Sequence, residues 1–132
     1  DFRDGHFDLV VSHLFFHETS AKAVRNVMHE ARRLLAPGGL MLHSDVPEAN
    51  QFHPELYDQW WRDWTTHYNA EPFRATLRDT SLVQAAVNAG FESSNMYETK
   101  VPSAAAAATY KKTHGYGAEW HMVVAEQSGQ VT

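Results

Sequence analysis

The chain has 132 residues, enough for one compact domain, with a hydrophobic fraction of 43% and a charged fraction of 20%. This composition is too apolar for a disordered protein and predicts a packed core. The formal net charge of −5 argues against general nucleic-acid binding, because the sequence offers no stripe of Lys and Arg to neutralise phosphates.

The cysteine count and the length of the apolar runs bear on where in the cell the protein is expected. The chain has no cysteine, which excludes a disulfide framework and a thiolate site. Its apolar runs are far shorter than the roughly 20 residues of a membrane span, and no signal-peptide pattern is present. We therefore expect a cytoplasmic protein with no membrane partner. Because the sequence starts at Asp1 and reaches an apolar strand within a few residues, we also expect it to be part of a longer protein.

The first 45 residues predict a strand, a helix and a second strand. Residues 7–12 form an apolar run that is typical of a parallel strand covered on both faces. Ser20 stands at the N-cap of a helix that should end at residues 36–39, where proline stops it and glycine supplies a left-handed cap. The apolar stripe of this helix consists of Val24, Val27, Met28, Ala31, Leu34 and Leu35. With a second strand over residues 40–44, the segment is a right-handed βαβ unit.

The remaining sequence predicts two helices and two strands. Residues 54–68 have aromatic side chains at helical spacing, and a second helix capped by Asp79 or Thr80 should run from Leu82 to Ala89. Phe91 should open a strand that continues to about residue 100, and a last strand should cover residues 120–125. The connection between these strands contains the alanine run 104–108 and no strong helix signal. We therefore expect the two strands to form an antiparallel pair at the sheet edge.

Two local motifs invite a chemical interpretation. Gly38-Gly39 follows a helix and precedes a strand, which is the reverse of a phosphate-binding loop, so it is interpreted as a turn. His13 and His17 are four residues apart with Glu18 beside them, but no His-Glu-x-x-His motif completes a zinc site. The alternatives are loop histidines satisfied by backbone hydrogen bonds and functional residues of a site.

Position in the sheet favours a functional role for the segment after the first strand. In open α/β sheets, ligands bind outside the carboxyl ends of the strands, so residues 12–18 should lie at the mouth of the site. Histidine changes charge near physiological pH and suits a general base. Asp45 leaves the second strand at the equivalent place.

Three stretches of the sequence resemble one known family. Residues 2–12, FRDGHFDLVVS, are similar to the segment that enters the fourth strand of class I S-adenosylmethionine-dependent methyltransferases. Residues 34–40, LLAPGGL, are similar to the Leu-x-Pro-Gly-Gly turn before the fifth strand. Residues 81–91, ending Ala-Gly-Phe, are similar to the step before the sixth strand. The three stretches occur in the family's order and spacing.

The resemblance implies an α/β fold of the Rossmann-like methyltransferase type, of which this chain would be the C-terminal half. The family's sheet has the strand order 3-2-1-4-5-7-6 with the last strand antiparallel, so residues 1–132 would supply strands 4, 5, 7 and 6. The family's glycine-rich cofactor loop and its ribose-binding acidic residue would lie upstream of Asp1. The aromatic segment at about 48–78 would be the insertion that covers the substrate.

The resemblance also implies a function and site residues. The complete protein would transfer a methyl group from S-adenosylmethionine to a small-molecule acceptor, and the isolated chain would be inactive. The residues expected to line the cofactor are Ser12, His13, Leu14 and His17, of which His13 and His17 are the candidate bases for a hydroxyl acceptor. The residues expected to face the acceptor are Asp45, Tyr57, Trp60, Trp61, Trp64 and Tyr68. For the tryptophans, packing onto the sheet is an equally weighted alternative to binding an apolar or cationic acceptor.

Two other functions remain open at this stage. The first is a non-catalytic domain that binds a small molecule or another protein, because residues 9–11 would form an unpaired strand edge open to self-association. The second and more remote alternative is a metal-dependent hydrolase, although we expect no metal site.

Overall fold

The computed structural model describes residues 2–45, 55–73, 77, 79–102 and 119–128. The strands are β1 (Phe7–His13), β2 (Leu35–Asp45), β3 (Met96–Pro102) and β4 (Glu119–Glu126). The α-helices are α1 (Ala21–Leu34), α2 (Glu55–Tyr68) and α4 (Leu82–Asn88), and single 3₁₀ turns lie at Phe16–Glu18 and Ser93–Asn95.

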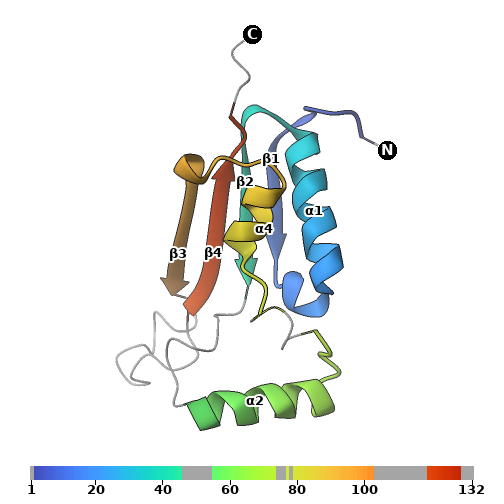
Figure 1. Cartoon of the computed structure of the whole chain (residues 1–132), viewed down its shortest axis with the longest axis vertical. Helices are drawn as coiled ribbons and strands as arrows, with labels where there is room; N and C mark the ends of the chain where they lie inside the picture. The colour runs from blue at the N-terminus through green and yellow to red at the C-terminus, as the bar shows by residue number, and fades with distance from the viewer. Residues whose placement is uncertain (1, 46–54, 74–76, 78, 103–118, 129–132) are drawn as a thin grey trace.

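The four strands form one mixed sheet in the order β1-β2-β4-β3 (Figure 1). β1 pairs with β2 in parallel, as expected of a βαβ unit, and β4 runs antiparallel to both of its neighbours. This is the predicted order 4-5-7-6 with the last strand antiparallel, so the predicted α/β topology is confirmed.

α1 packs on the sheet through the apolar stripe that the sequence predicts. Ser20 is its N-cap, with the side-chain oxygen accepting the backbone N–H of Ala23 at 3.2 Å. Val24, Met28 and Ala31 are buried on the side of the helix that faces β1 and β2. The helix thus covers the crossover between the two parallel strands.

The C-terminal end of α1 differs from the prediction. The helix ends at Leu34, and Leu35 already begins β2, so glycine does not cap it. Gly38 has a positive φ of 80°, but it lies within β2, where its N–H donates to the carbonyl oxygen of Gln127 at 2.8 Å. The pairing of β1 and β2 is irregular here, because Phe7 faces Leu35 while Leu9 already faces Leu40. The glycines therefore form an irregularity in the strand in place of a helix cap.

α4 and the start of β3 also correct the prediction. The cap of α4 is Ser81, whose side-chain oxygen accepts the N–H of Gln84 at 3.1 Å, and is neither Asp79 nor Thr80. Phe91 is buried in the core and does not open a strand, because the turn at Ser93–Asn95 intervenes and β3 begins at Met96.

The two faces of the sheet differ in their cover. α1 and α4 contact one face and each other, and Val123 and Ala125 of β4 are fully buried beneath them. On the opposite face, Leu9 and Val11 are 53% and 56% exposed. The prediction that β1 is covered on both faces is thus wrong for the part of the chain that the structure describes.

α2 lies across the end of the sheet at which β1 and β2 terminate, away from the two helices that cover the sheet (Figure 1). The bounds of α2 agree with the helix predicted over residues 54–68. No helix within the described ranges is long and apolar enough to cross a membrane. The alanine run 104–108 lies outside the described residues.

Gly39 allows the closest approach of β1 to the start of β2. A Cβ atom at Gly39 would lie 2.9 Å from the Ala36 carbonyl oxygen and 3.1 Å from that of Phe7, whereas one at Gly38 would meet nothing within 4 Å. We expect Gly39→Ala to lower the free energy of unfolding by about 1–3 kcal/mol through backbone overlap. Gly38→Ala should cost about 1–2 kcal/mol through its positive φ alone. Chemical denaturation measures both, and a clearly smaller loss for Gly39→Ala than for Gly38→Ala would contradict the packing explanation.

Candidate functional site

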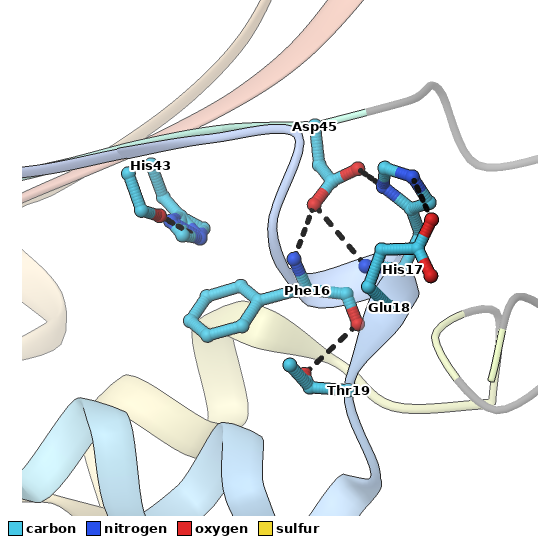
Figure 2. Close-up of polar contacts among 7 residues, drawn as sticks. Phe16, His17, Glu18, Thr19, His43 and Asp45 are labelled. Atoms are coloured by element: carbon cyan, nitrogen blue, oxygen red, sulfur yellow. Dashed lines mark hydrogen bonds and ion pairs between the residues drawn. The ribbon is translucent and has the colours of Figure 1, made fainter.

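The carboxyl ends of β1 and β2 bring two segments together that are about 30 residues apart in the sequence. His13 at the end of β1 pairs in register with Ser44 of β2, and the Leu14 N–H donates to the Ser44 carbonyl oxygen at 2.9 Å. The chain then turns through Phe16–Glu18, which places His17 beside Asp45 (Figure 2). Parallel pairing of two successive strands thus creates a polar site that neither strand contains alone.

Asp45 is the most buried polar side chain of this site. It is 1% exposed, and its Oδ2 atom accepts the backbone N–H groups of Phe16 at 2.7 Å and His17 at 3.3 Å. Its Oδ1 atom lies 2.6 Å from Nδ1 of His17, which is itself 8% exposed. A buried charge is tolerated only when it is paired and hydrogen-bonded, and these contacts supply that compensation.

The other ring nitrogen of His17 faces outward. Nε2 lies 3.3 Å from Oε1 of Glu18, whose side chain is half exposed. His17 therefore stands between a buried carboxylate and an accessible one (Figure 2). The imidazole connects the interior of the sheet with the surface of the site.

Leu14 adopts a backbone conformation that is uncommon for its residue type. Its φ of 52° falls in the left-handed region, which costs a non-glycine residue about 1–2 kcal/mol. Such outliers gather at ligand sites and persist only where the surrounding structure imposes them. Here the turn must leave β1 and still bring the N–H groups of Phe16 and His17 onto Asp45.

A second polar contact lies beneath the same turn. The hydroxyl of Ser12 forms a hydrogen bond with Nδ1 of His43, and the His43 ring lies 3.7 Å from the Phe16 ring, centroid to centroid (Figure 2). The pKa of His43 is lowered to about 4: burial is the main cause, Asp45 opposes the shift, and nearby His121 adds to it. His43 is therefore neutral at pH 7 and serves as a buried hydrogen-bonding group.

A third histidine contact crosses the antiparallel strands. His121 of β4 is buried, and its Nε2 lies 2.6 Å from Oε1 of Glu98 on β3. His121 also faces Asp45 in the register of β2 and β4. Polar side chains thus continue along the sheet from the site toward its far edge.

His13 has different surroundings from His17. Its ring packs edge-on against Trp120, with 5.2 Å between the ring centroids, and the residue is exposed. Successive strand residues point to opposite faces, so His13 lies on the face opposite Ser12 and His43. Of the two candidate bases, His17 is the one that lies beside carboxylates in the described part of the structure.

The predicted acceptor residues fall into two groups. Asp45 is buried and directed at His17, so it is not open to an acceptor in this conformation. Trp60, Trp64 and Tyr68 form an exposed stripe on α2, and the rings of Trp64 and Tyr68 lie 5.7 Å apart. Thr65, which follows Trp64 on the adjacent side of the helix, is buried.

The side chains of Tyr57 and Trp61 lie outside the described part of the structure. Among the residues that are described, no group of three or more potential ligands could hold a metal ion.

The sequence pattern did not predict three buried or paired polar residues, nor the contact between Asp45 and His17. His43, Glu98 and His121 received no role, although the count of nine histidines was a signal that some would pair inside the fold. Asp45 and His17 were both placed at strand ends, but their contact depends on a turn whose conformation the sequence pattern does not specify. The predicted parallel pairing of the two strands was the signal that could have placed Asp45 close to His17.

The comparisons with known proteins can now be set beside this geometry. Residues 1–43 match the sequence model of a methyltransferase domain family. No curated protein matches the chain. One matching structure is an arsenic(III) S-adenosylmethionine methyltransferase from Chlamydomonas reinhardtii. It is 22% identical with a TM-score of 0.55, over 97% of this chain and 39% of that one.

Two further solved structures show the same similarity. The phosphoethanolamine N-methyltransferase 2 of Haemonchus contortus has a TM-score of 0.61 at 11% identity, over 98% of this chain and 35% of that one. An O-methyltransferase family protein from Burkholderia thailandensis has a TM-score of 0.57 at 17% identity, over 96% of this chain and 32% of that one. The chain has the class I methyltransferase fold. The fold that the resemblance implied is thus confirmed, and the chain spans about a third to two fifths of the length of these structures.

The burial of His43 predicts a pH dependence of stability. Its pKa is about 4 in the folded chain and about 6.5 in the unfolded chain, so the unfolded chain takes up the proton first as the pH falls. The stabilisation is complete above pH 6.5 and is lost between pH 6.5 and pH 4. We expect the wild type to lose about 3 kcal/mol more than His43→Gln between pH 7 and pH 4, as measured by chemical denaturation at each pH. Equal losses in both proteins would contradict the assignment.

Proposed function

We propose that this chain forms the second half of a methyltransferase domain that transfers a methyl group from S-adenosylmethionine to a small-molecule acceptor. The observation that carries the proposal is the polar pair of His17 and Asp45 at the carboxyl ends of parallel strands in a methyltransferase fold. In open α/β sheets this edge is where ligands bind. The remaining strands and the glycine-rich cofactor loop would belong to the complete protein.

The residues after β1 fit a cofactor with an apolar and cationic reacting group. Leu14 and Phe15 are exposed apolar side chains at the site, and Glu18 adds an accessible carboxylate. We propose that Ser12, His13, Leu14 and His17 line this side of the cofactor. S-adenosylmethionine supplies an electrophilic methyl group, so the protein has to position the acceptor in line with it and exclude water.

His17 is the base that we propose for a hydroxyl acceptor. Its Nδ1 atom is held by Asp45, while Nε2 faces the outer side of the site. A base must reach the acceptor proton with a free nitrogen, and a fixed ring meets this requirement better than a mobile one. His13, which packs against Trp120, is the second candidate.

The exposed aromatic stripe of α2 would provide the acceptor wall. Trp60, Trp64 and Tyr68 recur every four residues on a helix that crosses the same end of the sheet (Figure 1). Aromatic faces bind apolar groups and attract cations. We propose that Tyr57 and Trp61, with their side chains outside the described part, belong to the same wall.

A second candidate function is a non-catalytic domain that binds a partner. Leu9 and Val11 expose apolar surface on β1, which lies at the sheet edge among the described strands. Exposed strand edges and apolar patches favour association with another chain, including a second copy. A domain of this kind would not need the cofactor.

Calorimetric titration of the complete protein with S-adenosylmethionine separates the two functions. We expect saturable heat with one site per chain, followed by transfer of a radiolabelled methyl group to an acceptor in a panel of hydroxyl and amine compounds. S-adenosylhomocysteine should compete for the same site. The absence of saturable heat would contradict the methyltransferase proposal and favour the partner-binding domain.

Two tyrosines provide a matched test of the acceptor wall. Tyr68 on α2 is 75% exposed and Tyr97 on β3 is 63% exposed, so replacing either by alanine removes the same accessible ring. We expect Tyr68→Ala to raise the KM for an acceptor about two- to fivefold, the range of an exposed cation–π contact. Tyr97→Ala should leave KM unchanged. Steady-state kinetics measures both, and an equal effect of the two replacements would contradict the role of α2.

A further inference from the structure

We propose that Asp45 is the positioning residue of this site, which holds His17 in the neutral form that carries its proton on Nδ1 and leaves Nε2 free to accept one. The inference deepens the proposed function, on which it rests, and assigns a hydroxyl-bearing acceptor to the site. The observation behind it is the contact between Oδ1 of Asp45 and Nδ1 of His17, combined with the two backbone N–H groups on Oδ2.

The backbone contacts fix the orientation of the carboxylate. An N–H group can only donate, so Oδ2 of Asp45 must be the acceptor for Phe16 and His17. The planar carboxylate then directs Oδ1 at the His17 ring, 2.6 Å from Nδ1. Because an ionised carboxylate can only accept, the ring nitrogen is the donor. The backbone of the turn thereby determines which nitrogen of His17 holds the proton.

The outer nitrogen is left with a lone pair. A neutral imidazole carries one N–H, and with Nδ1 protonated Nε2 is an acceptor. Glu18 lies 3.3 Å from Nε2 and has a half-exposed side chain. Glu18 is therefore the carboxylate nearest to the nitrogen that would take the acceptor proton.

The proton transfer and the methyl transfer balance as one step. The acceptor hydroxyl gives its proton to Nε2 of His17 while its oxygen forms the bond to the methyl group of S-adenosylmethionine. The bond between sulfur and that methyl group breaks, and its electron pair stays on sulfur. His17 ends as an imidazolium between Asp45 and Glu18, and returns the proton to water when the products leave.

Asp45→Asn changes the tautomer and keeps the shape of the side chain. The two backbone N–H groups of Phe16 and His17 still require an oxygen, so the amide oxygen should replace Oδ2. The NH₂ group then points at Nδ1, which must become an acceptor, and the ring proton moves to Nε2. The opposite amide orientation would leave two buried N–H groups facing a donor, at a cost of about 1–3 kcal/mol each.

The test combines nitrogen NMR of the histidine rings with kinetics on the complete protein. In the wild type at pH 8 we expect the His17 signal, assigned by its loss in His17→Gln, to report a proton on Nδ1. In Asp45→Asn it should report a proton on Nε2. The kcat for a hydroxyl acceptor should fall about 100-fold or more, the range of a lost general base, with KM changed less than kcat.

Glu98→Gln is the matched control, because it alters the other contact between a histidine and a carboxylate on the same sheet. It should leave the His17 tautomer as in the wild type and kcat within about twofold. A wild-type proton on Nε2 would overturn the positioning role without any variant. An inverted tautomer in Asp45→Asn with unchanged kcat would overturn the role of His17 as base.

Failure of the proposed function has a separate signature. If the complete protein binds no S-adenosylmethionine, the methyltransferase proposal fails, while the wild-type and Asp45→Asn spectra still decide whether Asp45 sets the tautomer. If the cofactor binds and the tautomer does not respond to Asp45→Asn, the positioning proposal alone fails.

Discussion

The parallel pairing of β1 and β2 is the constraint on which the rest of this structure depends. Two successive strands can run in parallel only if the chain crosses back over the sheet, and α1 makes that crossing through Val24 and Met28. Their carboxyl ends then meet at one edge, which brings Asp45 onto the turn that leaves β1. Burial of an apolar helix stripe and placement of a polar site are therefore consequences of the same connection.

The site itself is a compromise between burial and hydrogen bonding. Asp45 is almost fully buried, which would be strongly unfavourable for a charge without compensation. The compensation comes from the turn after β1, which passes through a left-handed Leu14 to present its N–H groups. The hydrogen bonds to Asp45 thus offset two costs, the backbone strain at Leu14 and the desolvation of Asp45. The result is a buried His17 whose Nδ1 atom is held by Asp45.

The sheet has a covered face and an open face, and both bear on function. The covered face joins the apolar core to polar residues such as His43 and His121, which are hydrogen-bonded inside the fold. The open face exposes Leu9 and Val11 at the edge strand. A chain of this shape can serve as part of a larger domain or as a partner-binding surface, and cofactor binding by the complete protein distinguishes the two.

Much of the fold follows from the sequence, because apolar spacing and capping residues depend on interactions within one helix or strand. The stripe of α1, the capping Ser20, the apolar β1 and the pair of β3 and β4 were predicted from spacing and composition, and the resemblance gave their order in the sheet. The ends of helices and strands were less predictable where contacts with other segments determine the role of a residue. Phe91 has strand-forming character but belongs to the core, and Gly38 and Gly39 belong to a strand, because β1 and the C-terminal residues pair with them.

The site, like the fold, was predictable only in part from the sequence. The sequence by itself determined that His17 and Asp45 lie at strand ends on one edge of an α/β sheet, since that follows from the alternation of strands and helix. Only the tertiary structure decided that Asp45 turns inward to His17 and that His43 pairs with Ser12. The reason is physical. The direction of a polar side chain depends on which unsatisfied donors and acceptors the folded backbone brings within reach, and no pattern along one chain segment contains that information.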